Sequence, residues 1–332
     1  MKVMQLKSHQ PIEKKPLIAL DASIPDPGDN QVLLRISACG ICHTDLHIIE
    51  GELPGGMLPV IPGHQVVGTL EKVGRNVRSH TTGERVGVAW LNKVDGACEY
   101  CQSGRENLCI GARFTGYHFN GGYAEYMVAD ASFLYRLPPN ISDLSAAPLL
   151  CAGIIGYRSL NLSGVMAGEL LGIFGFGAAA HIVLQLAKSR GCEVYVFSRD
   201  EGHRMLAKNL GADWVGTVAD QPPRLLHGAI NFAPAGSLVP SALAKLRKGG
   251  TLALAGIYMS PIPQLEYNSL YQERVIRSVT NNTYRDGVDF LKEAEKVSLK
   301  TETEIYPLHD ANEALIRLKN GKIRGAGVLA IN

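Results

Sequence analysis

The sequence has little net charge, no apolar signal segment near its start and no internal repeat, and each absence excludes a class of protein. Its 33 basic and 31 acidic residues give a formal charge of +2. This balance provides no electrostatic reason to expect a nucleic-acid or anionic-membrane partner. Met1 to Gln10 contain no signal-peptide core. We therefore expect a cytoplasmic protein.

The most apolar stretch, residues 170–187, is long enough to raise the question of a membrane span. It contains a Gly-x-Gly turn together with His181 and Gln185. These residues favour a buried strand, turn and helix, so we expect no membrane partner.

The chain is longer than one hydrophobic core usually spans. Its 332 residues, 46% hydrophobic and 19% charged, are typical of a soluble protein with two domains. The 7 cysteines of such a long chain indicate metal binding in a reducing compartment rather than a disulfide framework.

Chemically active side chains are concentrated in residues 39–47, Cys-Gly-Ile-Cys-His-Thr-Asp-Leu-His. A packed core alone does not require so many thiols, imidazoles and carboxylates. A catalytic zinc takes three protein ligands and leaves a fourth position open, and it prefers thiolate and imidazole. His64 and Cys151 are candidate partners further along the chain. Spacing leaves open that Cys39, His64 and Cys151 are simply buried core residues.

A second group of thiols lies within one loop. Cys98, Cys101 and Cys109 form a C-x2-C and C-x7-C arrangement. Ligands this close in sequence can surround a metal without help from distant structure, so the spacing predicts a zinc site. The alternative is a cluster of free thiols on an exposed loop.

Residues 1 to about 150 predict a β-rich, barrel-like domain. Short apolar or alternating runs at 32–36, 66–73 and 85–89 are separated by Pro-Gly turns such as 26–28. No long crossover helix separates the runs, which argues against a parallel sheet in this region.

The second half of the chain predicts a dinucleotide-binding fold. A strand at 169–174 leads into Gly175-Phe-Gly177, and a helical pattern follows. Gly175 permits the tight turn, Gly177 lets a pyrophosphate approach the backbone, and Ala180 allows close helix packing. The phosphates then face a helix N-terminus. Further predicted strands cover 193–197, 228–233, 250–256 and 274–279, and further predicted helices cover 238–248, 286–296 and 310–319.

Together these motifs resemble the zinc-dependent medium-chain alcohol dehydrogenases over nearly the whole chain. The resemblance rests on residues 39–47, 63–68, 95–109, 149–153 and 175–177. It implies an α/β protein made of a Rossmann-type doubly wound parallel sheet domain and a β-rich GroES-like catalytic zinc domain. The implied boundaries are 152–282 for the Rossmann domain and 1–151 with 283–332 for the catalytic domain.

The resemblance also implies the residues of a catalytic zinc site. Cys42, rather than Cys39, matches the first zinc ligand, and His64 and Cys151 complete the set. Asp45 matches a carboxylate that supports the zinc-bound imidazole, fixing its tautomer.

Two further matches concern the proton that leaves the alcohol. Thr44 matches the hydroxyl that receives it, and His47 matches the outer end of the proton relay, with a side chain that titrates near neutral pH. Gln65 replaces the glutamate usual after the zinc-binding histidine, so we expect slower ligand exchange at the metal.

The family has four cysteines in a structural zinc lobe, and Asp95 stands where the first should be. A carboxylate can ligate zinc, so we expect one Asp and three Cys (Asp95, Cys98, Cys101 and Cys109) to hold a second zinc per subunit. The alternative is a lobe that binds metal poorly or not at all.

The substrate and cofactor contacts are less specific. Trp90 and Leu91 match residues that line the substrate cleft, although Trp90 also fits a core aromatic. His43 replaces an arginine that often contacts the cofactor pyrophosphate. Arg324 matches another such arginine, with a solvated charge as the alternative.

The position that distinguishes the two nicotinamide cofactors is Ser198. An acidic residue there would bind the ribose 2′-hydroxyl of NAD, whereas a neutral residue followed by Arg accommodates the 2′-phosphate of NADP. Ser198 and Arg199 therefore favour NADP, and Asp200 keeps NAD open.

The implied function is zinc-dependent hydride transfer between a primary alcohol or aldehyde and NADP(H), with carbonyl reduction as the working direction. Family members pair along the late edge strand, which implies a homodimer or homotetramer. The alternative from another class is a redox-sensing or structural relative that binds cofactor without turnover. Zinc-free quinone reductases are disfavoured, because they need neither the ligand set nor the cysteine loop.

Overall fold

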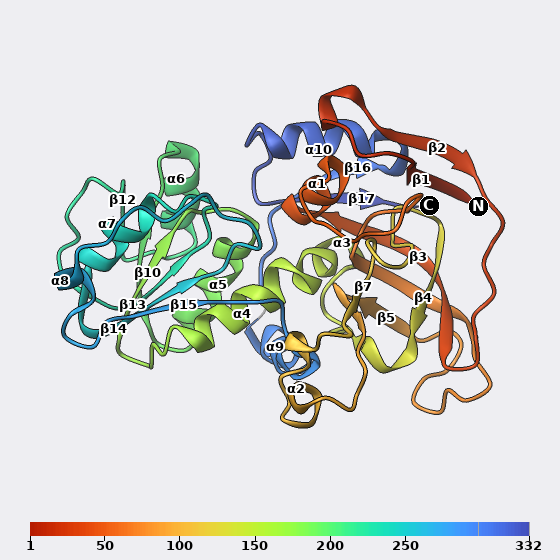
Figure 1. The fold of residues 1–332 in the computed structure, drawn as a ribbon, viewed down its shortest axis with the longest axis horizontal. Coiled ribbons are helices and arrows are strands. Elements are labelled where there is room, and N and C mark those ends of the chain that lie inside the picture. The colour runs from red at the N-terminus through yellow and green to blue at the C-terminus, as the bar shows by residue number, and fades with distance from the viewer. Residues whose placement is uncertain (298, 332) are drawn as a thin grey trace. The chain divides into compact units, whose positions relative to one another are not determined.

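The computed structural model describes residues 1–297 and 299–331. It divides into two compact units (Figure 1). Unit 1 contains Met1–Cys151 and the segment that starts at Asn282, and unit 2 contains Ala152–Asn281.

The largest element of unit 1 is a sheet in the order β16-β17-β3-β4-β5-β9, with β8 also paired to β3. Every pair is antiparallel except β16 with β17. Strand β3 is rich in Val, Leu and Ile and is buried along most of its length, as expected for a strand with partners on both edges. The strand bounds are β1 Lys2–Leu6, β2 Leu17–Asp21, β3 Gln31–Ile41, β4 Gln65–Val73, β5 Arg85–Val88, β6 Leu91–Lys93, β7 Arg113–Phe114, β8 Tyr126–Asp130, β9 Leu134–Arg136, β16 Thr303–Pro307 and β17 Ala326–Ala330.

The C-terminal segment joins unit 1 through its last strand. Strand β17 pairs antiparallel with β3, placing Val328 opposite Gly40 just before the residue 42–47 motif. The helices of unit 1 are α1 His43–Glu50, α2 Glu99–Gln102, α3 Asp143–Ala146, α9 Tyr284–Val297 and α10 Ala311–Lys319.

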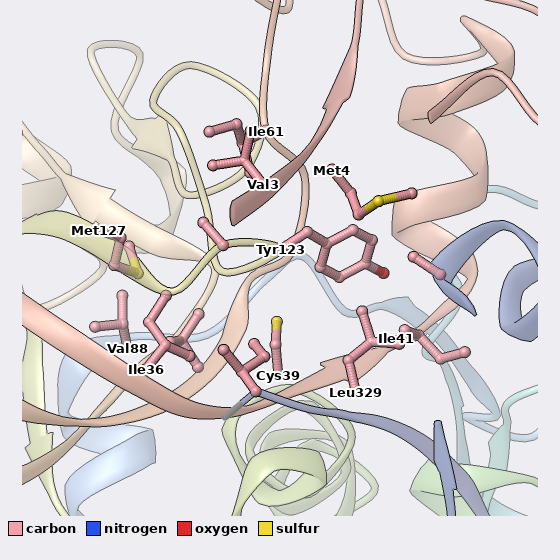
Figure 2. Close-up of a cluster of buried hydrophobic side chains, with 14 of the residues drawn as sticks. Val3, Met4, Ile36, Cys39, Ile41, Ile61, Val88, Tyr123, Met127 and Leu329 are labelled. Carbon is pink, nitrogen blue, oxygen red and sulfur yellow. The ribbon is translucent and has the colours of Figure 1, made fainter. Parts of the chain in front are cut away.

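The core of unit 1 contains aliphatic side chains around one buried tyrosine (Figure 2). Tyr123 and Cys39 are both fully buried there, with Met4, Ile41 and Leu329 nearby. Gly63 is required at this place, because its φ is 96° and a Cβ atom would lie 2.4 Å from Tyr123 Cδ1. The core therefore packs directly against the residue that precedes His64.

Unit 2 is built on a six-stranded parallel sheet in the order β12-β11-β10-β13-β14-β15. Numbered along the chain within the unit, this is the doubly wound order 3-2-1-4-5-6, and it reverses direction between β10 and β13. The strand bounds are β10 Leu170–Phe174, β11 Glu193–Phe197, β12 Trp214–Gly216, β13 Leu226–Asn231, β14 Leu246–Leu254 and β15 Val275–Ser278. The helices are α4 Ala152–Leu162, α5 Ala178–Ser189, α6 Glu201–Asn209, α7 Leu238–Ala244 and α8 Tyr267–Leu270.

The fold class predicted from the sequence is confirmed, with a parallel Rossmann-type sheet in unit 2 and a β-rich unit 1. One element boundary is wrong. The helix predicted for residues 238–248 ends at Ala244, because Leu246 is fully buried and pairs with Leu226 as the start of β14. Within residues 1–297 and 299–331, no helix combines the length and apolarity needed to cross a bilayer.

Candidate functional site

Three zinc-type ligands from distant parts of the sequence meet in unit 1. Cys42 is the N-cap of α1, His64 directly precedes β4, and Cys151 directly precedes α4. The ligand atoms of Cys42, His64 and Cys151 all lie within 4.8 Å of one another. The structure therefore brings together the three residues that the sequence analysis grouped.

The distances fit a tetrahedral zinc. Cys42 Sγ and His64 Nε2 are 3.3 Å apart. Zinc bonds of about 2.3 Å to sulfur and about 2.0 Å to nitrogen, at a tetrahedral angle, separate those two atoms by about 3.5 Å. Two thiols and one imidazole leave the fourth position free, as in catalytic sites.

A buried carboxylate orients the histidine. His64 Nδ1 lies 3.1 Å from Asp45 Oδ1, and both side chains are fully buried. Asp45 Oδ2 accepts a 2.9 Å hydrogen bond from the backbone N–H of Cys42. In neutral His64 the Nδ1–H donates to Asp45, so the lone pair of Nε2 points towards the two thiols, which is the tautomer that a metal requires.

The protonation states of the metal-free cluster follow from these contacts. Burial lowers the pKa of His64, but the charge of Asp45 and the side-chain contacts with Asp45 and Cys42 raise it more, and the net result is a pKa of about 10. The Cys151 thiol, followed by burial, raises the pKa of Cys42. At neutral pH both groups hold protons that a metal must displace, so metal affinity rises with pH.

Thr44 and His47 lie three residues apart on α1 and therefore on the same face of the helix. The backbone N–H of Thr44 donates to Cys42 Sγ at 3.3 Å, which places Thr44 beside the cluster. His47 is mostly buried and forms an ion-pair contact through Nδ1 with the partly exposed carboxylate of Glu52. Glu52 was not identified from the sequence, because a lone Glu carries no motif.

An aromatic stack lies on one side of His64. The Trp90 ring meets His64 edge-on with 5.0 Å between ring centroids. It also stacks on Phe114 at 4.8 Å and on Tyr117 at 5.8 Å. Leu91 is fully buried in a separate cluster with Cys109 and Phe133. Trp90, and not Leu91, is therefore the residue that borders the histidine.

Gln65 follows His64 and is buried against the opposite strand. Its amide lies so close to Gly40 that a Cβ on that glycine would be 2.9 Å from Gln65 Cδ. Within the described residues, Gln65 Nε2 has no hydrogen-bond partner. An unpartnered buried amide beside a ligand set is unusual in a purely structural core.

The cysteine-rich loop forms a second cluster. One ligand atom from each member lies within 4.8 Å of the others, and the members are Asp95, Cys98, Cys101 and Cys109. Asp95 Oδ2 is 3.1 Å from Cys109 Sγ, while Oδ1 accepts hydrogen bonds from the N–H groups of Cys98 and Ala97. These two N–H groups lower the pKa of Asp95 well below its usual range, so it is present as a carboxylate. The donor set fits a zinc held by one oxygen and three sulfurs.

In unit 2, the glycine turn lies at the switch point of the sheet. Gly175 has φ 81° and follows β10, and Gly177 is the N-cap of α5. A Cβ on Gly177 would meet nothing within 4 Å, so a ligand can approach the backbone there. Ala180, in the first turn of α5, is fully buried. This is the arrangement that holds a dinucleotide pyrophosphate at a helix N-terminus.

An arginine of α6 that sequence reasoning missed contacts the residues after β11. Arg204 Nη1 donates 2.8 Å hydrogen bonds to the carbonyl oxygens of both Ser198 and Arg199. Asp200 Oδ1 accepts from the backbone N–H of His203 at 2.7 Å and thereby caps α6. The N-cap spacing of Asp200 was a signal in the sequence that its carboxylate has a structural partner.

The last two sequence-predicted cofactor residues both lie in unit 1. His43 is exposed at the first turn of α1, next to the metal cluster. Arg324 is exposed, and its backbone N–H donates to Glu304 Oε1 at 2.7 Å.

Two parts of this chain match known protein families. Residues 28–139 match the alcohol dehydrogenase GroES-like domain, and residues 178–295 match the zinc-binding dehydrogenase family. The matched ranges cover the first two metal ligands and most of the Rossmann-type sheet.

Three similar proteins illustrate the range of relatives. A probable alcohol dehydrogenase of Mycobacterium tuberculosis, AdhA, is 45% identical over 100% of this chain and 97% of that protein. A cinnamyl alcohol dehydrogenase structure from Sorghum bicolor has a TM-score of 0.91 at 28% identity, covering 99% of this chain and 97% of the other. The structure of CAD from Helicobacter pylori complexed with NADP(H) has a TM-score of 0.88 at 27% identity, covering 100% and 99%.

The buried ion pair gives a testable prediction for the zinc-free protein. Replacing Asp45 with Asn should lower the pKa of His64 by about 1 to 3 units, because an opposite charge is removed while burial remains. The ring-proton chemical shifts of His64, followed by NMR against pH, measure this change. The exposed His309 is the control and should not respond. An unchanged His64 titration would contradict the assigned role of Asp45.

Proposed function

The chain belongs to the zinc-dependent medium-chain alcohol dehydrogenase family, and from this premise we propose that it is an aldehyde reductase and primary alcohol dehydrogenase that uses NADP(H). The observation that carries the proposal is the convergence of Cys42, His64 and Cys151, with Asp45 behind the histidine. As a member of this family it is an oxidoreductase that acts on a small-molecule substrate.

In this proposal unit 1 is the catalytic zinc domain and unit 2 is the dinucleotide-binding domain. Cys42, His64 and Cys151 hold the catalytic zinc. When bound, zinc supplies Lewis acidity to the substrate oxygen, and the nicotinamide ring donates or accepts the hydride. The surrounding residues then have to place the substrate and move one proton.

The proton is handled by α1. The hydrogen bond from Thr44 N–H to Cys42 Sγ holds the backbone of Thr44 beside the cluster. The Thr44 hydroxyl takes the alcohol proton or returns it to the carbonyl oxygen. His47 lies one turn further along the same face and exchanges the proton with solvent. Glu52, in contact with His47 Nδ1, holds the imidazole in place.

The substrate side chain packs on the aromatic stack. Trp90, supported by Phe114 and Tyr117, provides a flat apolar wall on one side of His64. Aromatic rings stack favourably on such a wall. Aldehydes with an apolar or aromatic group are therefore the proposed substrates.

The preference for NADP(H) is proposed from the end of β11. Ser198 carries no charge, and Arg199 and Arg204 add two positive charges beside it, which suit a 2′-phosphate. Asp200 already caps α6, which makes it a poorer partner for the 2′-hydroxyl of NAD. Arg324 and His43 are the proposed additional contacts to the pyrophosphate.

A second zinc is proposed in the lobe, held by one carboxylate and three thiolates. Its donor atoms are already gathered, and Asp95 is ionised without the metal. This zinc holds together the segment between β6 and β7 and takes no part in the reaction.

We propose a homodimer or homotetramer that pairs through β15. This strand is bonded to β14 on one side and to no described strand on the other. Val275 and the neighbouring Tyr267 and Tyr271 are exposed apolar residues, which unpaired edge strands rarely carry. A cytoplasmic location fits the free thiol state of all seven cysteines.

The proposal predicts zinc-dependent reduction of aldehydes. Initial rates of NADPH and NADH oxidation with aliphatic and aromatic aldehydes should show turnover that a strong chelator abolishes and added zinc restores. Cys151→Ala is a matched variant that removes one ligand without adding bulk, and it should lose turnover as well. Binding of NADPH without turnover of any aldehyde would favour a cofactor-binding relative that lacks dehydrogenase activity.

The cofactor preference is tested at Ser198. Ser198→Asp should lower kcat/KM for NADPH by about 10-fold to 100-fold relative to NADH, because a carboxylate repels the 2′-phosphate and removes a hydrogen-bond donor to a charged group. Asp200→Asn preserves the helix cap and serves as the control, with an unchanged ratio. If Asp200→Asn lowers kcat/KM for NADH and Ser198→Asp leaves the NADPH to NADH ratio unchanged, then Asp200 binds the ribose 2′-hydroxyl and the enzyme uses NAD.

A further inference from the structure

We propose that the hydroxyl of Tyr123 donates a hydrogen bond to the Asp45 carboxylate when zinc is bound, which makes Tyr123 a positioning residue for the zinc ligand His64. This inference rests on the proposed catalytic zinc site. It concerns a tyrosine that neither the sequence motifs nor the reaction requires.

The ring of Tyr123 is fixed against the chain that delivers His64. Its edge fills the space beside Gly63, and its backbone N–H donates to the carbonyl oxygen of Pro62 at 3.0 Å. The side chain is fully buried. In Figure 2 its hydroxyl end points towards the side of the cluster where Ile41, the residue before Cys42, is drawn.

The hydroxyl is placed in this core without a partner. Within the described residues, no acceptor meets hydrogen-bond geometry with Tyr123 Oη. Burial raises the pKa of Tyr123 well above its usual value, and the Asp45 carboxylate is the charge that raises it most after burial. Tyr123 is therefore a protonated donor, and the Asp45 carboxylate is close enough to act on its hydroxyl, although the pair does not meet the geometry of a hydrogen bond.

The Asp45 carboxylate can accept further hydrogen bonds. Its carboxylate accepts one hydrogen bond at each oxygen, from His64 Nδ1 and from the Cys42 backbone. A carboxylate has about four lone-pair sites, so roughly two remain unused in a place that water does not reach. An unsatisfied donor and an under-satisfied buried carboxylate therefore lie in the same core, and a small movement pairs them.

The bond has a consequence for the metal. Asp45 orients the zinc ligand His64, because its Oδ1 lies 3.1 Å from His64 Nδ1. A third hydrogen bond then stabilises the carboxylate and keeps it facing Nδ1. Loss of groups that orient a metal-bound histidine typically weakens metal binding by about 10-fold to 100-fold. Tyr123 acts one step further out, so we expect the lower end of that range.

The test removes one oxygen atom. Tyr123→Phe keeps the ring that packs on Gly63. Tyr135→Phe is the matched control, because Tyr135 is also buried in unit 1 and its hydroxyl also lacks a partner within the described residues. Tyr135 packs against Gly287 and Tyr284.

The release of zinc from the full-length proteins to a chelator is measured over time, and each zinc site should give its own kinetic phase. The phase that is missing in Cys151→Ala is assigned to the catalytic site. In Tyr123→Phe the zinc affinity of the catalytic site should be lower by about 10-fold, and the zinc affinity of the lobe should not change. In Tyr135→Phe both zinc affinities should equal those of the unmodified protein. The absorption bands of the cobalt-substituted site should shift in Tyr123→Phe only, because they report the ligand geometry. Core packing alone would not move them.

A change in catalytic-site affinity smaller than about threefold in Tyr123→Phe would overturn the inference. An equal loss in both variants would also overturn it, because it would reflect a general weakening of the core. If the unmodified protein shows no Cys151-dependent zinc at all, the proposed function fails together with this inference. That outcome is distinct from a catalytic site that binds zinc with the same affinity in Tyr123→Phe, which would contradict this inference alone.

Discussion

The geometry of the site depends on one buried charge. Asp45 is inside the protein, where an isolated carboxylate would be strongly disfavoured, and it is tolerated because a backbone N–H and His64 bond to it. The contact with His64 joins the start of α1 to the segment before β4, and the bond from the Cys42 N–H lies within the first turn of α1. The ion pair thus holds these two segments together and at the same time points His64 Nε2 at the thiols.

The rest of unit 1 supports this pair through close packing. Gly63 lets the chain pass under Tyr123, and β17 returns from the C-terminal segment to fix β3 just before Cys42. The Trp90 stack covers the other side of His64. A metal ligand set built from three distant positions needs such a rigid frame, because a displacement of half an ångström changes coordination. Stability and function therefore depend on the same contacts.

The parts of this protein that could be predicted are those whose function or backbone geometry requires particular residue types. Clustered cysteines, the residue 39–47 motif and the glycine turn each restrict the backbone or the ligand set, so the fold class and the residues of both clusters could be named. Arg204 and Tyr123 could not, because their roles come from contacts with distant residues and neither lies in a motif. The end of α7 was misplaced since Leu246 fits a helical pattern and a strand equally well.

We propose that zinc binds between Cys42, His64 and Cys151. The most direct measurement is anomalous diffraction at the zinc absorption edge from crystals of the protein grown with zinc. We expect a peak about 2.3 Å from both sulfurs and about 2.0 Å from His64 Nε2, in addition to any peak in the lobe. A crystal that shows zinc in the lobe and none between these three residues would contradict it.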